Sequence, residues 1–267
     1  FTSITEEDNT WAIFEMNVDG TGFRQVSPSM GNDIDNYDGV YLPSDQIIFD
    51  STSGYAGVPC VGGKDYVGNL NVMNPDGTNV RRLCFEQDND WYPAVMNNGR
   101  ILFLRWEYTD SAHYFSRVMM TMNPDGTDQK GFYGSNSYWP NSLFYARPVP
   151  GSATKFVGIV SGHHGVKRSG PLVLFDVTQG RHETDGAVQI IPGRGVPVEN
   201  KTIDNLAATY KDHCLYPYPL SDKYFLTSLN RNGWNLYLVD VFDNLIELKR
   251  DPSGGCLFEP LPLRATE

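Results

Sequence analysis

The residues of this chain best suited to chemistry are histidines that have tyrosines or arginines close by in the sequence. Histidine titrates near neutral pH, a tyrosine hydroxyl can pass a proton, and an arginine can pair with a carboxylate. Together, such side chains could bind an acidic sugar and move a proton, as polysaccharide lyases do. On these grounds the candidates for catalysis are His113, Tyr114, His163, His164 and Arg105.

The same histidines, with a cysteine, could instead bind a divalent transition metal. The candidates for metal ligation are His113, His163, His164, His213 and Cys60. No pair among them has the spacing of a known metal motif. Surface loops are also rich in polar residues in any protein, so the alternative is a polar rim that hydrogen bonds to the backbone. A divalent metal is therefore a hypothesis, and no cofactor is assigned.

Aromatic side chains near these histidines could stack on a bound ligand, and an arginine or a histidine could bind its polar groups. Glycines around His163 and His164 would let the backbone approach that ligand closely. We expect the binding surface to include Trp91, Trp106, Tyr108, Tyr138, Trp139, Arg168, His213 and Tyr216.

The elements that must position these residues are repeated along the chain. The sequence Met73-Asn-Pro-Asp-Gly-Thr78 occurs again, letter for letter, at residues 122–127, and Met16-Asn-Val-Asp-Gly-Thr21 differs by one residue. Asp-Gly between runs of β-forming residues is typical of a tight turn between two strands. The turn aspartates at 19, 76, 125 and 243 lie 57, 49 and 118 residues apart, which fits a unit of about 40–60 residues.

A four-stranded unit of that length is typical of the β-propeller, so we predict an all-β fold. We expect one propeller domain over residues 1–267, with five four-stranded blades, and with six or seven blades as alternatives. The predicted blades cover residues 36–84, 88–133, 136–193, 213–250 and, for the first, 256–263 together with 1–27. In that last blade the C-terminal strand would join the N-terminal blade and close the ring, which removes free sheet edges.

In a propeller, most of the candidate residues are expected to lie on one face. The loops that enter the inner strands and the loops between second and third strands share one face, which surrounds the central channel. All the histidines except His182 are predicted to lie on that face, and loops on a rigid scaffold are common sites of binding and catalysis.

The turn Met-Asn-x-Asp-Gly-Thr followed by Asp-x-x-x-Pro resembles the TolB-type propeller repeat. Longer segments between residues 35 and 263 are similar to the middle domain of hydrazine synthase alpha subunits and to uncharacterised secreted bacterial proteins. These segments are Trp106-Glu-Tyr-Thr-Asp110, His113-Tyr-Phe-Ser116, Tyr133-Gly-Ser-Asn-Ser-Tyr-Trp-Pro140, Ser161-Gly-His-His-Gly165 and Tyr237-Leu-Val-Asp-Val-Phe-Asp-Asn244. The resemblance implies an extracytoplasmic protein, which is periplasmic, secreted or on the cell surface.

The same resemblance raises the question of a haem, because hydrazine synthase alpha subunits carry c-type haems. This chain has no Cys-x-x-Cys-His motif, so no haem is attached covalently within it. A haem of a neighbouring domain or of a cytochrome subunit could still touch the loop face, and Cys60 would then be a candidate ligand.

The charge balance limits the partners. The formal net charge of -11 disfavours nucleic acid, because phosphate binding needs clustered lysines and arginines. No apolar run approaches the roughly 18 residues of a membrane span, so we predict no transmembrane segment. We expect a binding or scaffold domain whose ligand face surrounds the central channel, with a glycan or a partner subunit as ligand. The alternatives are a carbohydrate-active lyase or hydrolase and a subunit of a haem-containing redox complex.

Overall fold

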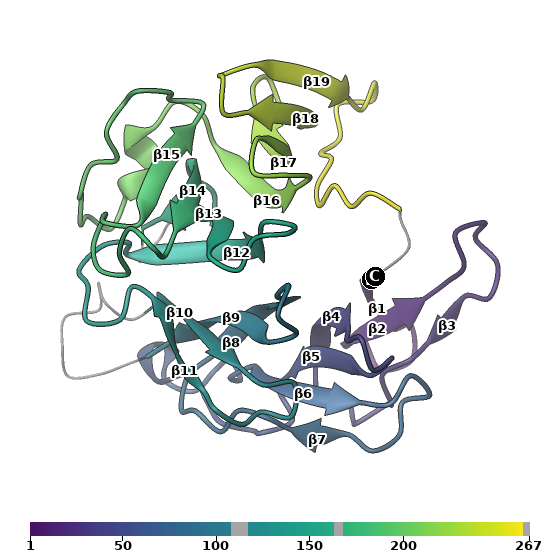
Figure 1. The fold of residues 1–267 in the computed structure, drawn as a ribbon. Coiled ribbons are helices and arrows are strands. Elements are labelled where there is room, and N and C mark those ends of the chain that lie inside the picture. Colours follow the sequence, from purple (N-terminus) through teal and green to yellow (C-terminus); the bar gives the residue numbers. More distant parts are fainter. Residues whose placement is uncertain (108–116, 163–167, 264–267) are drawn as a thin grey trace.

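The computed structural model describes residues 1–107, 117–162 and 168–263, and its architecture is all-β. The strands form five antiparallel sheets, which Figure 1 shows as blades around a central space. Four of these sheets have four strands, and the first has three. This is the five-bladed propeller that the repeat predicts.

The strands of each blade pair in the order in which they follow along the chain. Blade 1 contains β1 (Thr2–Ile4), β2 (Trp11–Glu15) and β3 (Arg24–Gln25). Blade 2 contains β4 (Asn36–Tyr41), β5 (Ile47–Ser51), β6 (Asn69–Met73) and β7 (Arg81–Arg82). Blade 3 contains β8 (Asp90–Val95), β9 (Ile101–Trp106), β10 (Arg117–Met122) and β11 (Lys130–Tyr133). Blade 4 contains β12 (Ser142–Pro148), β13 (Lys155–Ser161), β14 (Leu172–Asp176) and β15 (Ala187–Ile191). Blade 5 contains β16 (Cys214–Pro219), β17 (Tyr224–Asn230), β18 (Trp234–Asp240) and β19 (Leu245–Lys249). Two short 3-10 helices of the described residues, η1 (Pro59–Val61) and η3 (Leu206–Thr209), lie in loops.

Apolar side chains between neighbouring blades form the core. All six residues of β9 are buried, because this strand has a blade on each of its faces. Between blades 3 and 4, the rings of Phe156 and Phe175 stack at 4.7 Å between centroids, and Tyr133 meets Phe175 edge-on at 4.9 Å. This packing makes the blades a rigid frame for whatever lies at the centre.

The repeated Asp-Gly turns join one blade to the next. In the turn at 74–78 the Asp76 carboxylate accepts hydrogen bonds from the Thr78 amide at 3.0 Å and from the Thr78 hydroxyl at 2.6 Å. Arg24 of blade 1 donates from Nη2 to the carbonyl oxygen of Pro75 in the turn of blade 2, at 2.9 Å. Arg81 makes the equivalent bond to the carbonyl oxygen of Asp125 in blade 3, at 3.0 Å. The turns are therefore structural, and they act between blades as well as within one.

The closure of the ring differs from the prediction. Residues 256–263 form no strand, so within the described part of the chain blade 1 has three strands and no C-terminal strand joins it. The segment docks on blade 5 instead: the amide of Leu257 donates to the carbonyl oxygen of Trp234 at 2.9 Å. The ring of Phe258 also lies 5.6 Å from that of Trp234 and 6.1 Å from that of Tyr216. Its packing thus favours the preceding blade over strand pairing with β1.

Inner strands elsewhere in the ring begin with a similar hydrogen bond to the preceding blade. The amide of Asp90 in β8 donates to Gly68 of blade 2, and the amide of Cys214 in β16 donates to Gly170 of blade 4. The bond from Leu257 to Trp234 is the same contact one blade further on. Residues 257–261 therefore lie where an inner strand would follow blade 5.

Candidate functional site

The inner strands of blades 2 to 5 share one irregularity. Each has a break in its pairing register, between Tyr37 and Val40, Trp91 and Ala94, Phe144 and Arg147, and Leu215 and Tyr218. A bulge of this kind bends the strand and re-aims a side chain. At each break one residue other than glycine has a positive φ: Asp38, Tyr92, Tyr145 and Tyr216.

Glu259 in the C-terminal segment has the same backbone conformation, with φ of 56°. Bulky residues rarely adopt positive φ, and such strain tends to persist where it serves a site. Five segments of the ring thus present one such residue each, and all five of these residues line the same central cavity.

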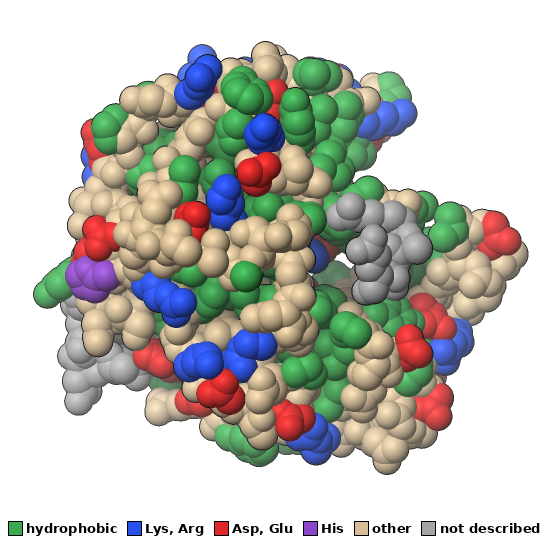
Figure 2. Space-filling model, viewed as in Figure 1, with side chains coloured by type: hydrophobic (Ala, Val, Ile, Leu, Met, Phe, Trp, Pro, Cys, Tyr) green, Lys and Arg blue, Asp and Glu red, His purple; other side chains and the backbone are tan. Residues whose placement is uncertain are grey.

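The cavity has a volume of about 1050 Å³ and is enclosed by the inner strands β4, β8, β12 and β16. Residues from blade 1, from the loop before β14 and from the C-terminal segment complete its wall. Figure 2 shows that this side of the molecule is hollowed between blade 5 and blade 1, with hydrophobic side chains on both sides. Ligand sites of drug-sized molecules span about 300–1,000 Å³, so this cavity could hold a ligand of several rings.

Three tyrosines from successive inner strands form one wall. The ring centroids of Tyr92 and Tyr145 lie 4.5 Å apart, and those of Tyr145 and Tyr216 lie 4.3 Å apart. Burial raises the pKa of Tyr92 to about 12, and burial with the two neighbouring hydroxyls raises the pKa of Tyr145 further. These hydroxyls are therefore neutral at physiological pH, and each can donate as well as accept a hydrogen bond.

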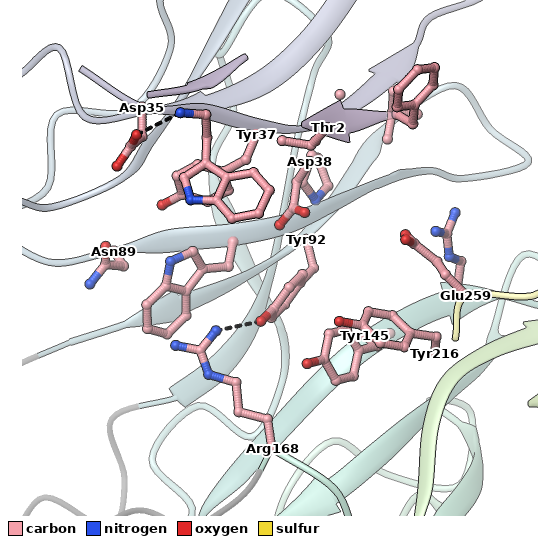
Figure 3. Close-up of a pocket in the computed structure, with 18 of the residues that line it drawn as sticks. Thr2, Asp35, Tyr37, Asp38, Asn89, Tyr92, Tyr145, Arg168, Tyr216 and Glu259 are labelled. Atoms are coloured by element: carbon pink, nitrogen blue, oxygen red, sulfur yellow. Dashed lines mark hydrogen bonds between the residues drawn. The ribbon is translucent and has the colours of Figure 1, made fainter. Parts of the chain in front are cut away.

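Arg168 lies beside this wall, immediately before β14 (Figure 3). Its Nη1 donates to the hydroxyl of Tyr92 at 2.6 Å, and its guanidinium carbon lies 4.7 Å from the ring centroid of Trp91. A second ring, that of Phe144, lies 5.7 Å away. These contacts fix the plane of the guanidinium, yet the side chain remains exposed to solvent in the cavity.

Two carboxyl groups and a second arginine complete the charged lining. Burial and then Glu259 raise the pKa of Asp38 to about 6, while Arg168 and Arg147 oppose the shift. Burial lowers the pKa of Arg147, and nearby Glu259 and Asp38 partly offset that effect. Although these groups feel one another, the guanidinium of Arg147 makes no ion pair or hydrogen bond with any residue that the structure describes.

A buried acid lies on β5, where Asp50 pairs with Tyr37 of the inner strand β4. Asp50 in β5 is fully buried, and neither of its carboxyl oxygens has a hydrogen-bond partner in the described part of the chain. Burial, with Asp38 and Asp90 nearby, raises its pKa well above the ordinary range. The backbone amide of Tyr92 opposes this shift without reaching hydrogen-bond geometry. Burial therefore favours the neutral, protonated form of the Asp50 carboxyl group.

The structure brings together some of the residues that the sequence singled out. Trp91, Trp106, Arg168 and Tyr216 all line the cavity. Trp139 is only 1% exposed and packs against Phe175 in the core. Tyr138 is 60% exposed and lies outside the cavity.

Arg105 and His213 have structural partners. The Nε of Arg105 donates to buried Asp90 at 2.9 Å, and an ion pair at 3.3 Å links this side chain to Glu86. The ring of His213 lies within hydrogen-bond distance of the Ser169 hydroxyl, at 3.3 Å, and of the Tyr210 carbonyl oxygen, at 3.1 Å. Neither Arg105 nor His213 lines the cavity.

The remaining candidates lie outside the described residues: His113, Tyr114, Tyr108, His163 and His164. The backbone of Cys60 belongs to η1, and its side chain is likewise not described. Within the described side chains, no three His, Cys, Asp or Glu residues converge as a metal site would require. The helices of the described part are also too short to cross a membrane.

Reasoning from the sequence missed Asp38, Tyr92, Tyr145 and Arg147 of the inner strands and Glu259 of the C-terminal segment. A signal for two of the bulges and for Glu259 was present, because the residue with positive φ stands between an apolar residue and proline. This pattern occurs in Trp91-Tyr-Pro93, Leu215-Tyr-Pro217 and Phe258-Glu-Pro260. Proline cannot donate to a strand ladder and is confined within sheets to edges and bulges, so the pattern could have located the site.

Comparison with known proteins identifies the fold. No family model and no curated protein sequence matches this chain. Among solved structures, hydrazine synthase of Kuenenia stuttgartiensis superimposes with a TM-score of 0.72 at 16% identity, over 94% of this chain and 37% of that one. TolB of Acinetobacter baumannii gives 0.57 at 10% identity, over 91% and 49%. Puromycin hydrolase gives 0.55 at 16% identity, over 93% and 36%.

The chain thus spans between about a third and a half of the length of these three structures. The similarity to TolB and to hydrazine synthase that the sequence indicates is confirmed as a shared propeller fold. At such low identity the comparison shows a common fold and not a common function, since one fold supports many functions.

Proposed function

We propose that this propeller is a binding domain and that it holds a saccharide in its central cavity. The observation that carries the proposal is the tyrosine wall of Tyr92, Tyr145 and Tyr216, flanked by charged groups with free hydrogen-bonding capacity. A sugar ring has apolar C–H faces that pack on aromatic rings, and hydroxyl edges that bind carboxylates and guanidinium groups. Both kinds of partner face this one cavity.

The pre-formed walls favour binding. The three tyrosines, whose rings are tilted against one another, are held by the bulges of three neighbouring strands. A site built on strands loses little conformational entropy when a ligand enters. Asp38 and Glu259 supply acceptors for sugar hydroxyls, and Arg168 supplies donors. The proposal needs no catalytic step.

Isothermal titration calorimetry with a panel of oligosaccharides, neutral and acidic, tests this function. We expect Tyr216→Ala to weaken binding at least tenfold, because it removes one stacking face of the wall. Tyr224→Ala is the matched control, since Tyr224 is an exposed tyrosine of β17 outside the cavity. Equal affinities of the wild type and Tyr216→Ala, or no binding by the wild type, would refute the proposal.

A partner subunit is the second candidate, and blade 1 carries the observation that favours it. The rings of Phe14 and Phe23 stack at 5.3 Å, and Phe23 is 60% exposed. Met16 and Val18, in the adjacent turn, are 55% and 81% exposed. Exposed apolar side chains gathered in one place are typical of a protein contact. A Phe23→Ser variant that still copurifies with every partner of the wild type would exclude this surface.

We also propose that the protein acts outside the cytoplasm, as its family resemblance implies. Fractionation of the source cells tests this location, and recovery of the protein in the cytoplasmic fraction would contradict it.

A further inference from the structure

We infer that the saccharide is acidic, and that Arg168 and Arg147 together bind its carboxylate. This inference rests on the proposed function, which it makes specific. Both arginines come from blade 4 or the loop within it, and both line the cavity. The evidence lies in the hydrogen-bonding groups that each leaves unused.

Arg168 is already oriented for an anion. Its Nη1 is occupied by the hydroxyl of Tyr92, which is its one hydrogen-bond partner within the described residues. Trp91 and Phe144 hold the plane of the guanidinium through their rings. Nε and Nη2 have no hydrogen-bond partner among the residues that the structure describes, and a guanidinium fork matches the two oxygens of a carboxylate.

Arg147 has a stronger need for a partner. It is the residue at which the register of β12 resumes after the bulge, and its charge is partly withdrawn from water. A desolvated cation without a direct partner is unfavourable, and an anion in contact with it removes much of that cost. Glu259 and Asp38 are near enough to influence the pKa of Arg147, but neither forms an ion pair with it.

The balance of charge limits how much negative charge the ligand carries. Asp35, Asp38, Asp65 and Glu259 line the same cavity as the two arginines. Four carboxyl groups against two guanidinium groups leave no excess of positive charge for a phosphate monoester, which carries about -1.5 to -2 charges at neutral pH. A single carboxylate on each sugar ring can face the arginines while the hydroxyls face the acids. The lining therefore fits a uronic acid unit.

The test compares three probes of the same length and linkage: tetragalacturonate, its methyl ester and the neutral galactose tetramer. For the wild type we expect tetragalacturonate to bind at least tenfold more tightly than its methyl ester. Arg168→Gln and Arg147→Gln should each reduce that preference to less than threefold, because the ratio of the two affinities is measured within each variant. Arg147→Lys keeps the charge without the fork and should give an intermediate preference.

Arg250→Gln is the matched control, because this arginine lies at the end of β19 and outside the cavity. Far-ultraviolet circular dichroism shows whether each variant is folded. If the wild type binds the acid and its methyl ester equally, the inference fails and saccharide binding stands. If no saccharide of either kind binds, the proposed function fails with it.

Discussion

At the scale of single residues, Asp38 links the cavity to pH. Its pKa of about 6 arises from burial and from Glu259, against the pull of Arg168 and Arg147. The side chain titrates in a range where the carboxylate of a uronic acid stays ionised. Its protonation removes one negative charge that a bound carboxylate would otherwise meet.

We therefore expect acidic saccharides to bind more tightly as pH falls from 7.5 to 5.5. A gain on the order of fivefold fits one screened charge at close range. Titration calorimetry at four pH values measures it, with the neutral tetramer as the reference ligand. Asp38→Asn should bind with little change over this range. A slope that persists in Asp38→Asn would show that protonation of Asp38 is not its cause.

The buried acid Asp50 affects the stability of the folded protein. Because its pKa is raised in the folded protein, folding takes up a proton there, and the free energy of unfolding falls as pH rises from the ordinary carboxyl pKa. Asp50→Asn removes the ionisation and keeps the shape. We expect it to raise the free energy of unfolding at pH 8 by about 1–3 kcal/mol, with a smaller gain at pH 5. Urea unfolding at both pH values measures this, and Asp45→Asn on an exposed turn is the control.

At the scale of elements, the repeated turn acts as a connector between blades. Gly77 has φ of 81°, and a Cβ built there would lie 2.5 Å from the carbonyl oxygen of Val26 in the preceding blade. Gly99 in the turn before β9 has nearly the same φ, 77°, but a Cβ there would meet nothing within 4 Å. Substituting each of these two glycines therefore distinguishes the cost of backbone strain from the cost of disturbing the contact between blades.

Gly99→Ala should lower the free energy of unfolding by about 1 kcal/mol, through strain alone. Gly77→Ala should cost about 1–2 kcal/mol more, because the Val26 carbonyl must also move. Thermal or urea unfolding of both variants gives the difference. Equal losses would mean that the turn of blade 2 yields freely and is not fixed to blade 1.

The elements also show what could be read from the sequence and what could not. The Asp-Gly turns are local motifs whose residues make their own hydrogen bonds, so the blades were predictable from them. The bulges are not encoded in the same way, because a break in register depends on the partner strand. The proline after Tyr92 and after Tyr216 is their local sequence signal. The pKa of Asp38 depends on Glu259, more than two hundred positions away in the sequence, and no local pattern encodes that contact.

At the scale of the whole molecule, the cavity exists only because segments from all around the ring meet at the centre. Its wall includes residues of all five blades and of the C-terminal segment. The weakest of these contributors is that segment, which is held to blade 5 by the Leu257 amide and by the ring of Phe258 but has no strand ladder. A ligand that contacts Glu259 must stabilise this docked position, since binding and docking are thermodynamically linked.

Hydrogen exchange of the Leu257 amide should therefore slow when a saccharide binds. At ligand concentrations of 100 times Kd, linkage limits the protection to about a hundredfold, and partial coupling gives less. Phe258→Ala removes the ring that packs on Trp234 and Tyr216, so it should speed exchange at Leu257 without ligand and weaken binding several-fold. The amides of β17, at the centre of blade 5, serve as the internal reference, because their ladders do not involve the segment. If the exchange rate of the Leu257 amide is the same with and without ligand while binding is intact, the ligand contacts the inner strands alone. Glu259 would then not belong to the site.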